Sequence, residues 1–115
     1  MILVVLTGGC TSTNRNTAIT VTSLDNGEFP YDTVGNFDVY TGSFLISNPS
    51  NATAEKISVN IRISPTAAYC HGQTSTFDIP RMDPNAKKIV RISIAEFSGL
   101  DCQYNYTYQV FTRPN

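Results

Sequence analysis

The stretch Lys56-Ile57-Ser58-Val59-Asn60-Ile61-Arg62-Ile63-Ser64 decides the fold class. Isoleucine or valine occupies every second position, and polar side chains occupy the positions between them. Successive side chains of a β-strand point to opposite faces, so this alternation predicts a strand with one buried and one solvated face. Pro65 then ends the pattern, because proline has no N–H to donate to a sheet.

The same period of two recurs on both sides of this stretch. It predicts further strands within residues 18–23, 37–47, 76–79, 88–95 and 103–112, and a loop or two turns over residues 25–36. Six strands at ~8–15-residue spacing without an amphipathic helix predict a β-sandwich or a small barrel. The expected core residues are Phe44, Ile46, Ile57, Val59, Ile61, Val90, Ile92 and Val110.

Composition narrows the classes of function. The 115 residues suit one domain, and 8 Lys plus Arg against 9 Asp plus Glu give a net charge of −1. Because no block of basic residues is present to neutralise phosphates, we expect no nucleic-acid partner. Only 15% of the residues are charged, and Ser, Thr and Asn supply most of the polarity. This balance favours a small domain outside the cytoplasm.

The N-terminal sequence MILVVLTGGC joins an apolar run, Ile2 to Leu6, to small residues and Cys10. It resembles the end of a signal peptide with the lipobox of bacterial and archaeal lipoproteins, which implies a lipid on Cys10 and a membrane anchor. Residues 11–17 are polar and without periodicity, as in a flexible tether. We therefore divide the chain into residues 1–17 (signal-peptide remnant, lipobox and tether) and a domain over 18–115. In the alternative, residues 2–6 form a buried strand and Cys10 is a plain thiol.

Cysteine count favours one disulfide. Three cysteines are present, and an odd number in an exported protein requires a separate role for one of them. Lipidation of Cys10 would leave Cys70 and Cys102 to pair. In the chain-entropy model, closing the loop between them stabilises the fold by ~3–4 kcal/mol. The alternative is two free thiols in a reducing compartment.

Other candidate sites carry weaker signals. Asp25, Glu28, Asp32 and Asp38 stand in an acidic stretch that could offer oxygen ligands to calcium, although their spacing matches no EF-hand. His71 directly follows Cys70, and neighbours on an extended chain project to opposite sides, so we expect no catalytic pair. We predict no cofactor. Tyr104, Tyr106 and Tyr108 share one face of the last strand, where they either fill the core or bind a partner.

Two stretches resemble immunoglobulin-like modules of prokaryotic surface proteins. Residues 42–61, which contain Asn48-Pro49-Ser50 between two alternating segments, are similar to modules of the FxLYD and CARDB type. Leu100 and Tyr106 resemble the tyrosine corner of fibronectin-III-like domains, in which the tyrosine hydroxyl bonds to upstream backbone. The resemblance implies an Ig-like Greek-key sandwich of about six to seven strands.

These observations predict a non-enzymatic, lipid-anchored Ig-like module outside the cytoplasm, on the cell surface or in the periplasm. It would contact an unknown protein or envelope partner. The alternatives are a calcium- or glycan-binding module that uses residues 25–38, and a purely structural component of the envelope.

Overall fold

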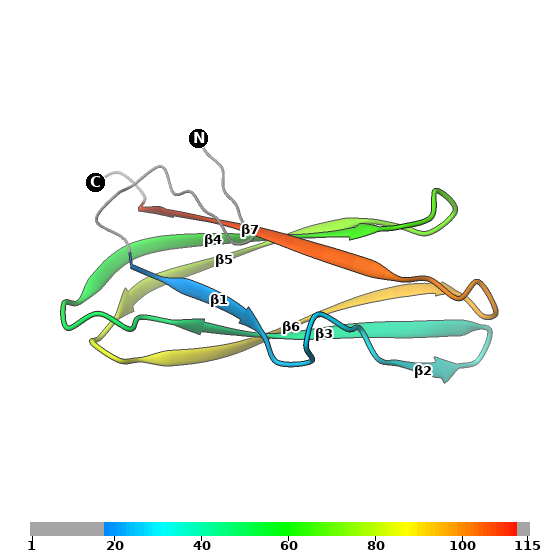
Figure 1. Cartoon of the computed structure of the whole chain (residues 1–115), viewed down its shortest axis with the longest axis horizontal. Helices are drawn as coiled ribbons and strands as arrows, with labels where there is room; N and C mark the ends of the chain where they lie inside the picture. Colours follow the sequence, from blue (N-terminus) through cyan, green and yellow to red (C-terminus); the bar gives the residue numbers. More distant parts are fainter. Residues whose placement is uncertain (1–17, 113–115) are drawn as a thin grey trace.

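The computed structural model describes residues 18–112, which form seven antiparallel strands in two facing sheets (Figure 1). One sheet contains β1, β2, β3 and β6, and the other has the order β5-β4-β7. The all-β sandwich expected from the sequence is confirmed. The strands are β1 (Thr20–Ser23), β2 (Tyr31–Val34), β3 (Phe37–Ser47), β4 (Ala54–Pro65), β5 (Gln73–Met82), β6 (Lys87–Phe97) and β7 (Tyr104–Thr112).

Strand β3 organises the first sheet. Its side chains are buried at every second position, and it pairs with β6 from Phe37↔Phe97 to Ser47↔Lys87. Along its other edge, β2 pairs with the beginning of β3 and β1 with its end. Residues 24–30 pass beside the short uncovered part of β3 between these two partners, where the Thr41 N–H donates to the Pro30 carbonyl.

Strand β4 has the same role in the second sheet, between β5 and β7. Its alternating isoleucine and valine side chains face the first sheet and have at most 1% of their surface exposed. The predicted core is confirmed, because all eight of its members are buried: Phe44, Ile46, Ile57, Val59, Ile61, Val90, Ile92 and Val110. Tyr104 is buried as well, and Tyr106 and Tyr108 pack against this core.

Asn48 connects the two sheets at the end where β3 meets β4. Its buried side-chain amide donates to the carbonyls of Ala52, Met82 and Asp83, and its oxygen accepts from Ser50. A buried amide needs such partners, since an unpaired polar group in the interior costs about 1–3 kcal/mol. The Asn48-Pro49-Ser50 motif therefore ties the β3–β4 connection to the turn that precedes β6.

The expectation of a loop over residues 25–36 is corrected by β2. Gly35 and Asn36 form a two-residue turn between β2 and β3, and Gly35 has a φ of 62°. Glycine at the first turn position is what such a hairpin requires. All four residues of β2 are exposed, so the strand lacks the alternation of apolar and polar residues that revealed the others.

The predicted signal-peptide remnant, Cys10 and the tether of residues 1–17 lie outside the described residues. Within residues 18–112, no helix is long and apolar enough to cross a membrane.

Because one face of β4 is buried, we predict that alanine substitutions at two isoleucines differ clearly in their effect on stability. Ile61→Ala should destabilise the protein by about 2–5 kcal/mol, because the side chain is fully buried and its removal leaves a cavity. Ile89→Ala is the matched control, since Ile89 is 51% exposed, and it should change stability by less than about 1 kcal/mol. Urea unfolding measures both; equal losses would show that the packing around Ile61 is not as described.

Candidate functional site

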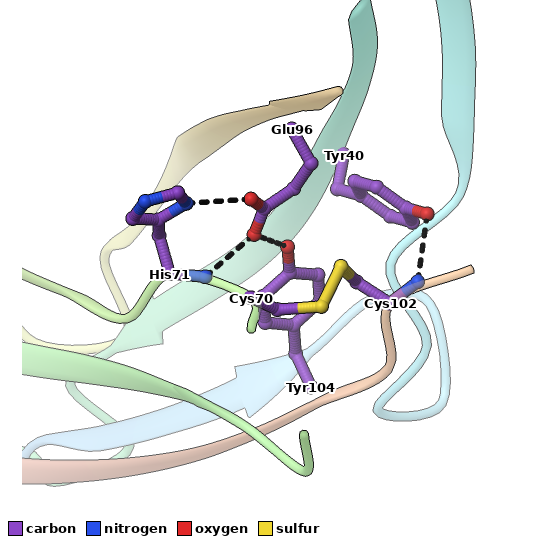
Figure 2. A network of polar contacts seen from close by, with 6 residues as sticks. All are labelled: Tyr40, Cys70, His71, Glu96, Cys102 and Tyr104. Atoms are coloured by element: carbon purple, nitrogen blue, oxygen red, sulfur yellow. Dashed lines mark hydrogen bonds and ion pairs between the residues drawn. A yellow bond between two sulfur atoms is a disulfide. The ribbon is translucent and has the colours of Figure 1, made fainter. Parts of the chain in front are cut away.

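A disulfide fastens the end of the sandwich at which β7 begins. Cys70, in the β4–β5 connection, is bonded to Cys102, with a Cα–Cα distance of 6.1 Å (Figure 2). Both residues are buried. The predicted pairing is confirmed, and the bond holds the 66–72 connection against the segment that leads into β7.

Glu96 lies beside this disulfide with none of its side chain exposed. One carboxylate oxygen accepts from the His71 backbone N–H at 2.7 Å and from the Tyr104 hydroxyl at 2.5 Å. The other oxygen lies 2.6 Å from His71 Nδ1, which carries the hydrogen when the carboxylate is ionised. Figure 2 shows His71, from the β4–β5 connection, and Tyr104, from β7, converging on the carboxylate.

The network fixes the charge states of Glu96 and Tyr104. Burial opposes ionisation of Glu96, but the hydrogen bonds from His71 and Tyr104 outweigh it and hold the pKa of the carboxyl below its usual value. Burial and the adjacent Glu96 carboxylate raise the pKa of the Tyr104 phenol. Glu96 is thus an anion and Tyr104 a neutral donor at neutral pH.

Tyr40, on β3, supports the same end from the sheet that contains Glu96. Its hydroxyl accepts from the backbone N–H of Cys102 at 3.0 Å. Burial raises the pKa of this phenol against the effect of that hydrogen bond, and the negative charges of Asp38 and Asp101 add to the increase. The tyrosine-corner resemblance implies that the Tyr106 hydroxyl contacts the segment before β7. In the structure, the Tyr40 hydroxyl makes this contact instead.

Tyr106 and Leu100 have other contacts. The Tyr106 hydroxyl accepts from the backbone N–H of Ser23, in β1, at 3.3 Å. Leu100 is partly buried and packs against the core. Tyr106 therefore bridges β7 to the first sheet and does not close the connection that precedes its own strand.

The arrangement limits the chemistry of the cysteines. Cys70, Glu96 and Cys102 are the one group of three potential metal ligands within residues 18–112, with ligand atoms within 4.8 Å of one another. Metal binding and nucleophilic attack both require a thiolate, which a disulfide sulfur is not. While the bond is intact, Cys70 and Cys102 brace the structure, and Glu96 orders the loop beside them.

The acidic residues predicted as calcium ligands are not brought together. Within the described part of the chain they form no group of three ligand atoms. Asp25 accepts from the Ser43 backbone N–H, and Glu28 lies in the exposed segment before β2. Asp32 is on β2, and Asp38 is on β3, buried. A hydrogen bond from Thr33 lowers the pKa of Asp38 against the effect of its burial, with help from Gly99 and Ser98.

A surface cleft of about 520 Å³ opens beside the disulfide. Residues 27–31 form one wall, residues 102–104 form the other, and Tyr40 lies between them. This volume is within the range of about 300–1,000 Å³ that small-molecule sites have. Sequence reasoning missed the cleft, because its two walls are separated by more than 70 residues of chain and meet only in the folded sandwich.

Both walls are held in place before any ligand arrives. Besides the Thr41–Pro30 bond, Leu24 N–H donates to the Ser43 carbonyl at 2.8 Å. Phe29 lies directly on Gly42, where a Cβ atom would be only 2.4 Å from the ring. The disulfide and Tyr40 fix the other wall at Cys102. A preformed site of this kind loses little conformational entropy on binding.

Comparisons with known proteins name no relative: no protein-family model, curated protein or solved structure matches the chain.

The Glu96 network predicts a pH-dependent effect of Glu96→Gln. Because the pKa of the folded-state carboxyl is lowered, ionisation of Glu96 stabilises the fold above the unfolded-state pKa of about 4.3, and this contribution is lost as pH falls through the folded-state value. Replacing a charged acceptor of three donors should cost about 1–3 kcal/mol at pH 7. The cost should shrink below pH 4.

Urea unfolding of both proteins at pH 7 and pH 3.5 checks this difference. Glu55→Gln, at an exposed position on β4, is the matched control and should change little at either pH. An equal loss for Glu96→Gln at both pH values would mean that the charge of Glu96 does not stabilise the loop.

Proposed function

We propose that this chain is a non-enzymatic Ig-like binding module, held outside the cytoplasm by a lipid on Cys10, that engages a protein or another component of the cell envelope through the cleft beside the disulfide. The observation that carries the proposal is the preformed cleft between two braced chain segments. Residues 27–31 and 102–104, together with Tyr40, line this cleft.

Several features support an Ig-like module in an oxidising compartment. Strands β1, β3 and β6 face β5, β4 and β7, with the chain crossing between sheets after β3, β5 and β6. Crossing connections of this kind are characteristic of Greek-key sandwiches. The buried Cys70–Cys102 bond is compatible with a location outside the cytoplasm, because reducing systems keep cytosolic thiols free.

A binding role suits the site better than catalysis. The two cysteines are bonded to each other, and the Glu96 carboxylate is occupied by His71 and Tyr104. A hydrolytic site would instead need a nucleophile and a base free to exchange a proton with a substrate. The strongest polar groups near the cleft thus maintain its shape, which is the requirement of a receptor surface.

The anchor can be tested in cells that produce the full chain. Wild type should fractionate with membranes and give an N-terminal peptide whose mass includes a lipid on Cys10. Cys10→Ser should lose the lipid and leave the membrane fraction, while the matched control Ser12→Ala should keep both. Retention of Cys10→Ser in the membrane fraction, with an unlipidated wild-type peptide, would contradict the anchor.

Envelope binding can be tested with the purified full chain and envelope fragments of its own cells that have been depleted of it. Tyr31→Ala should weaken binding about fivefold or more, as expected for an aromatic residue that contributes over 1 kcal/mol to an interface. Tyr69→Ala is the matched control, because Tyr69 is similarly exposed but does not line the cleft. Absence of wild-type binding would favour a purely structural component, and equal binding by both variants would place the contact elsewhere.

A further inference from the structure

The charges around the cleft have one sign. Glu28 lines the cleft and no Lys or Arg does. Asp38 and Asp101 lie close enough to Tyr40 for their charges to oppose its ionisation. On β6, in contrast, Lys87 and Lys88 pair with the far end of β3.

The near-zero net charge of the chain is therefore unevenly distributed, and the charged side chain that lines the cleft is acidic. Clefts lined by one sign of charge concentrate the electrostatic potential and attract ions of the opposite sign. The cleft is thus unsuited to phosphate, carboxylate or any other anion, and it favours a cation.

Aromatic rings give the cleft a second property. Tyr31, 53% exposed, lies against Tyr40 with ring centroids 5.0 Å apart. Tyr40 contacts Tyr104 at 5.2 Å, and Tyr104 contacts Phe29 at 5.5 Å. The faces of such rings carry negative electrostatic potential, and they attract ammonium and guanidinium groups that approach within about 6 Å. A bare metal ion, which prefers several oxygen ligands, would gain little from them.

Two polar groups at the cleft are available to a ligand. Within residues 18–112, the Glu28 carboxylate and the Gln103 side-chain amide have no hydrogen-bond partner, and both residues are exposed. The Tyr40 and Tyr104 hydroxyls, in contrast, are engaged with Cys102 and Glu96. A ligand would therefore meet one carboxylate and one amide at the rim and the exposed ring of Tyr31, which rests on the buried ring of Tyr40.

Resting on the proposed function, we infer that the cleft binds an organic cation, an ammonium or guanidinium group carried by a small molecule or by a peptide side chain, with Glu28 as its counter-charge and Tyr31 as its aromatic surface. A cation–aromatic contact at an exposed site and an ion pair at the rim are both weak, because water competes for each of them. Each therefore changes affinity by only a few fold, and the complex depends on salt concentration.

Amide NMR titrations of the full disulfide-bonded chain test this inference. The probes are butylammonium, a capped pentapeptide of four glycines around one arginine, which carries the same single charge, and cellobiose as an uncharged ligand. We expect both cations to shift the resonances of residues 27–31 and 102–104, and to bind more weakly when NaCl rises from 0.05 to 0.5 M, because salt screens the attraction. The tighter of the two cations identifies the source of the charged group.

Matched variants connect the shifts to the named residues. Glu28→Gln and Tyr31→Ala should each weaken cation binding about two- to fivefold, whereas Glu55→Gln and Tyr69→Ala should leave it unchanged. Each variant is first checked for a folded wild-type-like spectrum. Equal weakening by Glu55→Gln would show non-specific attraction to acidic groups and overturn the inference.

Two further outcomes separate this inference from the proposed function. If cellobiose shifts the cleft resonances and the cations do not, the cleft is a binding site for a neutral ligand and the cation inference is wrong. If no probe shifts them while envelope binding still depends on Tyr31, the inference also fails and the binding module stands. Loss of envelope binding together with retained cation binding would overturn the proposed function alone.

Discussion

A buried carboxylate is the constraint on which one end of this protein depends. With its side chain out of contact with water, Glu96 must find hydrogen-bond donors inside the fold, and it finds them in His71 and Tyr104. These donors come from the β4–β5 connection and from the first residue of β7, so satisfying one charge positions two segments that are distant in sequence. The Cys70–Cys102 bond joins the same two segments covalently. The Glu96 carboxylate thus orients the two segments that the disulfide joins, and the cleft lies beside them.

The opposite wall of the cleft depends on a different kind of constraint. Residues 24–30 follow the uncovered part of β3 between β1 and β2, held by backbone hydrogen bonds at Leu24 and Pro30. The absence of a side chain at Gly42 allows the Phe29 ring to lie on the strand. One wall is thus maintained by polar and covalent links and the other by close packing, and both meet at Tyr40.

Sequence periodicity predicted most of the scaffold and little of the site. Alternation revealed β3, β4, β6 and β7, because an apolar residue at every second position has one physical explanation. The cysteine count predicted the disulfide. The missed features share a physical cause, since each involves polar or exposed residues whose partners lie far along the chain. The strand predicted over residues 88–95 stops one residue short of Glu96, because an inward carboxylate breaks the apolar pattern, and the donors of Glu96 cannot be read from neighbouring residues. Strand β2 was not predicted, because neither of its faces is buried. The Gly35-Asn36 pair is nevertheless a hairpin signal.

The disulfide also determines how the module would respond to a mechanical load. Cys70 and Cys102 are 32 positions apart and enclose β5 and β6 entirely. When the chain is pulled from its two ends, force passes through the sulfur bridge, so β5 and β6 carry no tension even after the sandwich opens. At about 3.3–3.6 Å per extended residue, the disulfide prevents about 110 Å of chain between the two cysteines from extending. If the domain is held at one end and pulled at the other, only the residues outside the disulfide loop can therefore extend.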